Sequence, residues 1–293
     1  MSSPPPPRRD VPSTPATPVP PQASRAGRNL PAAIASGVVL GVAIIVSLLF
    51  WKTAFMVIVV AAVLVALWEL AHAFGTGEIR INRGPVMVGG TVMVLVAYFF
   101  GAPALVTATA VTALAAMLWR LRGGVAGYVM DMTAAVFTIV YVPFLGGFVA
   151  LLLSEERGER AIVTFILVTI ASDIGGYAVG VVAGKHPMAR VISPKKSWEG
   201  FAGSAVSCVV AGWLSVTYLL DGRWWVGVLI GLIAVVMATL GDLCESVIKR
   251  DLGIKDMSQI VPGHGGLMDR LDSLLATAAP VWLMLHYLVL NRI

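Results

Sequence analysis

The residues best suited to chemistry gather near the end of the chain, between Gly241 and Asp272. Only 13% of the chain is charged, yet carboxylates and basic side chains concentrate in this one stretch, between two apolar runs. A charged side chain at membrane depth costs about 2.5–3.5 kcal/mol unless it pairs, binds an ion or lines water. Solvation alone does not account for such a cluster, and we predict that it carries the chemistry.

The first part of this stretch, read as a helix, has one polar face. Asp242, Glu245, Ser246 and Lys249 recur at i, i+3, i+4 and i+7. The sequence PGHGG follows at 262–266, where glycines let backbone N–H groups approach an anion closely, and further carboxylates come directly after it. Carboxylates on both sides of a glycine-rich turn suit a divalent metal that holds phosphates.

A second candidate group lies upstream, where Asp173 interrupts an apolar run. An acid in such a place is a functional candidate, with a buried helix–helix hydrogen bond as the alternative. Gly176, Gly180 and Gly184 follow at a spacing of four, which predicts close packing of another helix.

The sequence SPKKSWEG at 193–200 supplies a basic pair ahead of a predicted helix. Lys195 and Lys196 can bind phosphates there, and Ser197 can cap the helix. The alternative is a basic cluster that contacts anionic lipid headgroups.

The elements that position these groups are apolar. The 293-residue chain is 58% hydrophobic, with a mean hydropathy of +0.86, which predicts an all-α, polytopic transmembrane helical bundle. Residues 1–29 form a predicted disordered, Pro-rich tail. We expect N-terminal membrane helices over 30–160 and catalytic ones over 161–293. The chain has nine apolar runs, at about 30–51, 53–71, 85–100, 102–119, 130–153, 161–183, 201–220, 224–248 and 273–290.

The distribution of Lys and Arg predicts the orientation. With nine spans and a cytoplasmic N-terminus, most basic residues, including those of both candidate groups, fall on the cytoplasmic side, as the positive-inside rule requires. The net charge of +5 does not indicate nucleic-acid binding, because the basic residues lie between apolar runs. Cys208 and Cys244 are predicted as small apolar fillers and make no disulfide framework.

Two motifs together resemble a known family. Ser246-x-Ile248-Lys249-Arg250, Lys255-Asp256 and Pro262-x-His264-Gly265-Gly266-x-x-Asp269-Arg270-x-Asp272 resemble the signature of the phosphatidate cytidylyltransferases, the CDP-diacylglycerol synthases. Val261 departs conservatively from the expected Leu, Ile or Phe. SPKKSWEG resembles a second block of the same family, so the resemblance covers about residues 170–290.

The resemblance implies an enzyme of phospholipid biosynthesis, in the inner (plasma) membrane with its active site on the cytoplasmic face. CTP and phosphatidate would react there to give CDP-diacylglycerol and pyrophosphate. The resemblance also implies that the enzyme contacts membrane lipid and forms a homodimer. Asp242 and Asp269 match the acids that hold Mg²⁺, and a second cation is compatible with the site. The predicted catalytic residues are Asp173, Lys195, Lys196, Asp242, Lys249, Asp269 and Arg270. The predicted substrate-binding residues are Ser193, Lys195, Lys196, Ser197, Glu245, Ser246, Lys249, Arg250, His264, Gly265, Gly266 and Asp272.

Three other functions compete. An ion-coupled transporter also carries intramembrane acids and Gly-interrupted spans, but the polar residues here crowd one face and no two-fold repeat is visible. A CTP-dependent lipid kinase would transfer the γ-phosphate instead. A relative acting on ether lipids would differ only in the tails it binds. Glu69 and His72, at i and i+3 near the end of the second run, are left open as site residues.

Overall fold

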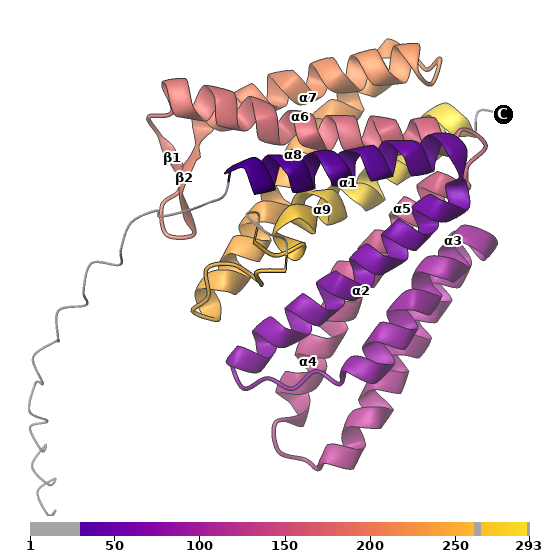
Figure 1. Cartoon of the computed structure of the whole chain (residues 1–293), viewed down its shortest axis with the longest axis vertical. Helices are drawn as coiled ribbons and strands as arrows, with labels where there is room; N and C mark the ends of the chain where they lie inside the picture. Colours follow the sequence, from indigo (N-terminus) through magenta and orange to yellow (C-terminus); the bar gives the residue numbers. More distant parts are fainter. Residues whose placement is uncertain (1–29, 261–264, 292–293) are drawn as a thin grey trace, which may run out of the picture.

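The computed structural model describes residues 30–260 and 265–291, so the predicted tail at 1–29 and His264 lie outside the described residues. The described chain is helical apart from one short β-hairpin, which confirms the all-α prediction (Figure 1). Its elements are α1 (Leu30–Phe50), α2 (Lys52–Thr76), α3 (Arg83–Arg120), η1 (Leu121–Gly123), α4 (Tyr128–Ile139), η2 (Val140–Phe144), α5 (Leu145–Ser154), α6 (Gly158–Ala183), β1 (Pro187–Ala189), β2 (Ser193–Ser197), α7 (Trp198–Tyr218), α8 (Trp224–Asp251), α9 (Met268–Leu285) and η3 (His286–Leu290).

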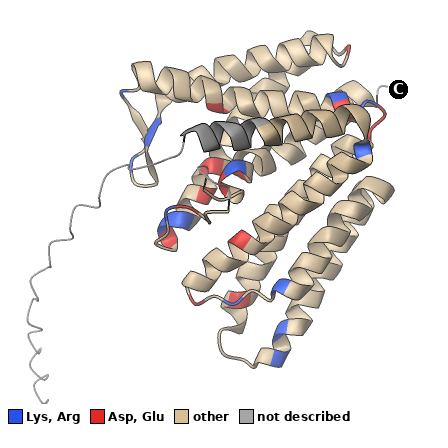
Figure 2. Ribbon diagram, in the orientation of Figure 1, with Lys and Arg blue, Asp and Glu red and all other residues tan. Residues whose placement is uncertain are grey.

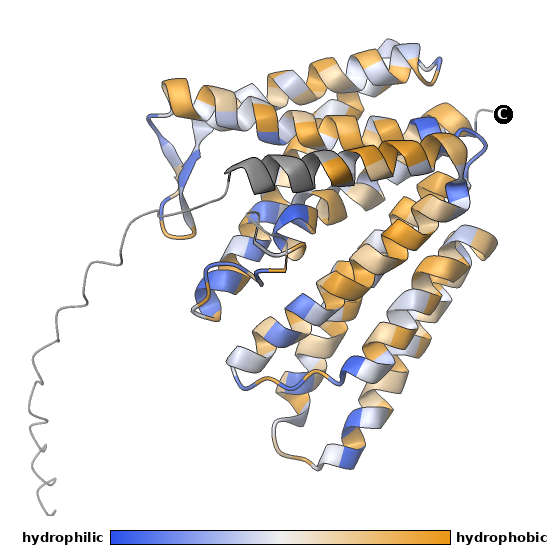
Figure 3. Ribbon diagram, viewed as in Figure 1, coloured by the Kyte–Doolittle hydropathy of each residue, from blue (hydrophilic) through white to orange (hydrophobic). Residues whose placement is uncertain are grey.

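Seven helical stretches among the described residues are long and apolar enough to cross a membrane. They are 52–76, 83–123, 128–154, 158–183, 198–218, 224–251 and 268–290, and α1 precedes them. Hydrophilic residues collect towards the ends of the bundle, where the helices are connected (Figure 3). The protein is therefore a helical membrane protein by length and composition.

The longest of these stretches contains a reversal of the chain. Gly101 in α3 has φ 80° and ψ −170°, a conformation that only glycine adopts readily, and Pro103 follows. A Cβ atom on Gly89 would come within 2.2 Å of the Thr112 side chain, although 23 residues of straight helix would separate the two by about 35 Å. The halves 83–100 and 102–120 therefore fold back on each other, which settles what the sequence left open for the short runs at 85–100 and 102–119, namely whether they are merged into one straight span.

Small residues let α6 and α7 approach closely, as the glycine spacing predicted. A Cβ on Gly176 would lie 2.5 Å from Ser204 Oγ, and one on Gly180 would lie 3.8 Å from the Cα of Gly200. Such contacts matter in a membrane, where helices associate by van der Waals packing and hydrogen bonds more than by the hydrophobic effect.

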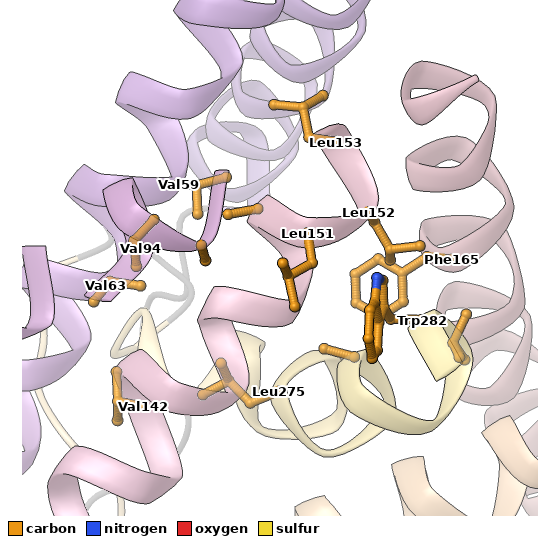
Figure 4. Close-up of a cluster of buried hydrophobic side chains, with 14 of the residues drawn as sticks. Val59, Val63, Val94, Val142, Leu151, Leu152, Leu153, Phe165, Leu275 and Trp282 are labelled. Atoms are coloured by element: carbon orange, nitrogen blue, oxygen red, sulfur yellow. The ribbon is translucent and has the colours of Figure 1, made fainter. Parts of the chain in front are cut away.

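A buried apolar cluster joins the first helices of the chain to the last ones. Figure 4 shows side chains from α2, α3, α5, α6 and α9 within it. Leu151, Leu152 and Leu153 of α5 are at most 2% exposed, and Leu275 and Trp282 of α9 belong to the same cluster. The cluster therefore fixes where α9 begins relative to α2, a relation on which the candidate site depends.

One buried charge pair serves the fold alone. Arg120, at the end of α3, donates to Asp131 of α4 at 2.8 Å and to the carbonyls of Gly124 and Ala126. Asp131 also accepts from the backbone N–H of Arg80. These bonds occupy both side chains and fix the connection between α3 and α4.

Candidate active site

A cavity of about 340 Å³ lies where β2 and the facing parts of α6, α7 and α8 meet. It brings together six of the residues singled out from the sequence. They are Asp173, Ser193, Lys195, Lys196, Ser197 and Asp242. The three predicted segments that contain these residues, spread over positions 173 to 242 of the chain, therefore share one space.

An ion pair connects the basic segment at 193–200 to α8 across this cavity. Lys196 Nζ lies 2.5 Å from Asp242 Oδ2, and the two side chains are 26% and 37% exposed. Lys196 and Asp173 are also close enough to interact electrostatically, as are Arg270 and Asp173. Two acids and two lysines thus line the same cavity, so an anion and a cation can both find partners there.

A β-hairpin positions the two lysines. Strands β1 and β2 pair antiparallel, with Pro187 opposite Ser197 and Ala189 opposite Ser193. The sequence predicted a basic segment before a helix but not this hairpin, since strands of three and five residues leave too short a pattern to detect. Arg250, predicted to bind substrate, donates from Nε to the Ile192 carbonyl at 3.5 Å and so contacts the base of β2.

The start of α7 opens onto the same cavity. Ser197 Oγ accepts from the backbone N–H of Gly200 at 3.1 Å, which confirms the predicted helix cap. Glu199 accepts from the backbone N–H groups of Lys185 and His186 and so ties the segment between α6 and β1 to the start of α7. The first turn of a helix presents unpaired N–H groups and a positive dipole end, which favour an anion.

The polar face predicted for α8 is present. Ser246 Oγ donates to Asp242 Oδ1 at 3.3 Å, and Lys249 Nζ donates to Glu245 Oε2 at 3.1 Å. Lys249 also donates to Asp269 Oδ1 of α9 at 2.6 Å. The side chain of Glu245 is 1% exposed and that of Lys249 is 17% exposed, so Lys249 supplies a largely shielded positive charge that holds α8 against the start of α9.

Asp269 is not among the residues that line the cavity. Its Oδ2 accepts from the backbone N–H groups of Met257 and Gly266, at 3.1 and 3.0 Å, and Lys249 takes Oδ1. Among the described residues no cluster of three or more His, Cys, Asp or Glu is arranged to hold a metal ion. The structure therefore brings Asp242 and Asp173 to one cavity and ties Asp269 to the glycine-rich turn.

The last residues of the predicted set lie near this turn. Asp272 is buried and interacts electrostatically with Asp242. Gly265 has φ 89°, which favours glycine, and a Cβ on Gly266 would come within 2.8 Å of Asp269 Oδ2. The turn therefore needs both glycines for its shape.

The sequence left open whether Glu69 and His72 belong to the site, and the structure gives them different surroundings. Glu69 of α2 is fully buried and accepts from the backbone N–H groups of Leu267 and Met268, at 2.9 and 2.6 Å. His72 stacks on Trp68, with ring centroids 5.4 Å apart, and lines a different hollow. Glu69 thus belongs to the framework of the site, and His72 does not reach the cavity.

Sequence reasoning missed some residues that line the cavity. Ser172, Tyr177 and Ser204 are among them. Tyr177 follows Asp173 at i+4, so it shares a helix face with that acid, and this spacing was the available signal. Cys208 is buried as predicted, whereas Cys244 is exposed and is not a core filler, because it lies off the packed face of α8.

Comparison with known proteins identifies the family. The sequence profile of the cytidylyltransferase family matches residues 31–288. This chain belongs to the cytidylyltransferase family. The match also covers the N-terminal helices, so the family likeness extends well beyond residues 170–290, where the motifs of the sequence lie.

Some members of the cytidylyltransferase family are similar to this chain over most of its length. The phosphatidate cytidylyltransferase of Mycobacterium bovis is 41% identical over 295 residues, covering 96% of this chain and 95% of its own length. That of Mycobacterium leprae is 40% identical over 90% of both chains. The phosphatidate cytidylyltransferase of Haemophilus influenzae is 35% identical over 51% of this chain and 55% of its own length.

Proposed function

We propose that this chain joins CTP and phosphatidate into CDP-diacylglycerol and releases pyrophosphate. The observation that carries the proposal is the single cavity in which Lys195 and Lys196 of β2 meet Asp173 and Asp242 at the start of α7. The relatives that match nearly the whole chain bear the name phosphatidate cytidylyltransferase, which supports this pair of substrates.

The lipid phosphate is the nucleophile and attacks the α-phosphorus of CTP. A phosphate monoester has a second pKa of about 6, so it is largely dianionic at neutral pH and needs little help from a base. The harder task is to bring this dianion up to a triphosphate. Lys195, Lys196 and the first turn of α7 would neutralise and orient the phosphates, so catalysis rests on positioning and charge without a covalent enzyme intermediate.

The acids of the site fit Mg²⁺. Magnesium is usually bound by one or two carboxylates together with substrate phosphates, so a cluster of three protein ligands is not required. We propose that Asp242 and Asp269 would hold it, with a second cation possible. When bound, Mg²⁺ would supply charge neutralisation to the phosphates. Asp242 lines the cavity, and Oδ1 of Asp269, which now accepts from Lys249, would be the atom offered to the cation.

Lys249 and Arg270 would then act on the phosphates from the α8–α9 side. Lys249 lies one turn beyond Glu245 and contacts both acids that flank it. Arg270 lies near enough to Asp173 to interact with it electrostatically. The remaining predicted substrate-binding residues, which we propose contact substrate or shape its site, are Ser193, Ser197, Glu245, Ser246, Arg250, His264, Gly265, Gly266 and Asp272.

We also propose nine spans in the inner membrane, with the N-terminus and the active site on the cytoplasmic side. In Figure 2, many Lys and Arg lie at the end of the bundle that carries the β-hairpin and the ends of α3 and α8. This asymmetry supports the orientation by the positive-inside rule. Catalytic residues concentrated in 161–293, and a homodimer, remain parts of the proposal that rest on the family resemblance.

Purified protein supplied with phosphatidate and CTP labelled separately at the α- and γ-phosphates tests the reaction. We expect label from the α-phosphate to enter the lipid and label from the γ-phosphate to leave as pyrophosphate. Transfer of the γ-label to lipid would identify a kinase instead, and the absence of any transfer would favour a transporter.

A further inference from the structure

Glu69 is the only charged side chain of α2 beyond Lys52 within the described helix, and it is fully buried. It is separated in sequence by almost 200 residues from the groups it binds. An isolated buried carboxylate is costly, so its retention requires compensating hydrogen bonds. Three donors from the segment around the glycine-rich turn supply them.

Those donors come from the connection between α8 and α9 and from the first residue of α9. Glu69 Oε1 accepts from the backbone N–H of Leu267 at 2.9 Å and from the hydroxyl of Ser258, and Oε2 accepts from the N–H of Met268 at 2.6 Å. Leu267 directly precedes α9 and Met268 is its first residue, and the first N–H groups of a helix have no partner within it. Glu69 therefore caps α9 from a distant helix and joins its start to Ser258.

A second carboxylate, that of Asp269, joins the neighbouring residues of the same two segments. Asp269 Oδ2 accepts from Met257 and Gly266, the neighbours of the residues that Glu69 binds. A Cβ on Gly266 would lie 2.8 Å from Asp269 Oδ2 and 3.2 Å from Glu69 Oε1. The two carboxylates thus approach Gly266 together and hold residues 257–258 to residues 266–268.

We infer that Glu69 is a positioning residue for the reaction: it fixes the start of α9, and through it the orientation of Asp269. This inference rests on the proposed function for its effect on turnover. It assigns the N-terminal helices a part in the site, because the acid that sets the geometry of the α8–α9 connection comes from α2.

Glu69→Gln is the discriminating variant. Glutamine keeps the size, but its amide nitrogen is a donor and cannot accept from a backbone N–H. At least one of the three bonds is then lost. Glu155→Gln is the matched control, because Glu155 contacts His286 at 2.6 Å beyond the other end of α9. A general loss of α9 stability would affect both variants.

Two measurements test the inference on full-length protein in detergent. Hydrogen exchange of the backbone N–H groups of Leu267 and Met268 should accelerate about tenfold or more in Glu69→Gln and stay unchanged in Glu155→Gln. In the α-label assay, kcat of Glu69→Gln should fall about tenfold or more, with KM for both substrates within about threefold of wild type. Ser258→Ala, which removes one donor and buries no new charge, should show a smaller change in the same direction.

Unchanged exchange in Glu69→Gln would overturn the inference, as would faster exchange with normal kcat, or an equal loss in Glu155→Gln. If wild-type protein transfers no α-label, the proposed function fails. The exchange measurement then still decides whether Glu69 holds the start of α9.

Discussion

Lys196 offers the sharpest test of how this site handles phosphate. Its ammonium group lies 2.5 Å from Asp242 in the cavity, and its side chain is 26% exposed. Removing one desolvated donor that stabilises developing charge costs about 10²–10³ in kcat. Because solvent reaches part of Lys196, we expect Lys196→Gln to lower kcat/KM by about 10- to 100-fold, about 1.4–2.7 kcal/mol. Lys195 is exposed, so Lys195→Gln should fall at the lower end of this range.

The competing explanation is attraction of the lipid surface, which has a different salt dependence. A lysine near an anionic membrane surface contributes about 1 kcal/mol at low ionic strength, and screening removes most of this as the Debye length falls to about 3 Å in 1 M salt. A contact inside the cavity is screened much less.

We would therefore assay these variants in neutral detergent micelles at low and high ionic strength. Lys185→Gln is the control. Lys185 is exposed just after α6 and does not line the cavity, so its substitution removes the same charge away from the site. A defect of Lys196→Gln that disappears in high salt, or that Lys185→Gln reproduces, would refute the role in phosphate binding.

Three further outcomes are expected. Asp242→Asn and Asp269→Asn should each abolish turnover in protein that still folds and inserts, because an amide lacks the charge a metal needs. More than a few per cent of wild-type activity at saturating Mg²⁺ would contradict the metal assignment. Lys249→Met should lower the free energy of unfolding by about 3 kcal/mol, because it removes the positive charge that Glu245 and Asp269 share. Adding Asp269→Asn to this variant should recover part of the loss in a detergent unfolding titration, and fully additive losses would refute the pairing. In a Cys244→Ser background, a cysteine at the exposed Glu156 should react with an impermeant thiol reagent only from outside and one at the exposed Asp251 only from inside; labelling of both from one side would break the nine-span orientation.

The helices could be predicted because hydropathy is a local property of the chain. The run predicted at 130–153 is the stretch 128–154, and that at 161–183 is 158–183. The predicted end of the eighth run, at 248, falls short of the end of α8 at Asp251. Lys249 extends this helix beyond its apolar part because it pairs with Glu245 one turn earlier, and hydropathy does not record such a pair.

The site was predictable only where its geometry is local. Spacing on α8 placed Asp242 and Lys249 on one face, and the cap at Ser197 followed from the helix start. The cavity itself depends on how α6, α7 and α8 pack, so the pairing of Lys196 with Asp242 was not accessible from spacing. Glu69 is the extreme case, because its partners are almost 200 residues away.

Under the proposed function, the ion pairs of the site explain how strong acids and lysines can coexist there. Each of the two proposed metal-binding acids is paired with a lysine, Asp242 with Lys196 and Asp269 with Lys249. Each pair reduces the cost of holding its carboxylate in a largely apolar helical bundle. If the two acids held a divalent cation, its charge would balance theirs, and the ammonium groups of Lys196 and Lys249 would be available to phosphate oxygens. Cation binding and phosphate binding would then favour each other by the same coupling free energy.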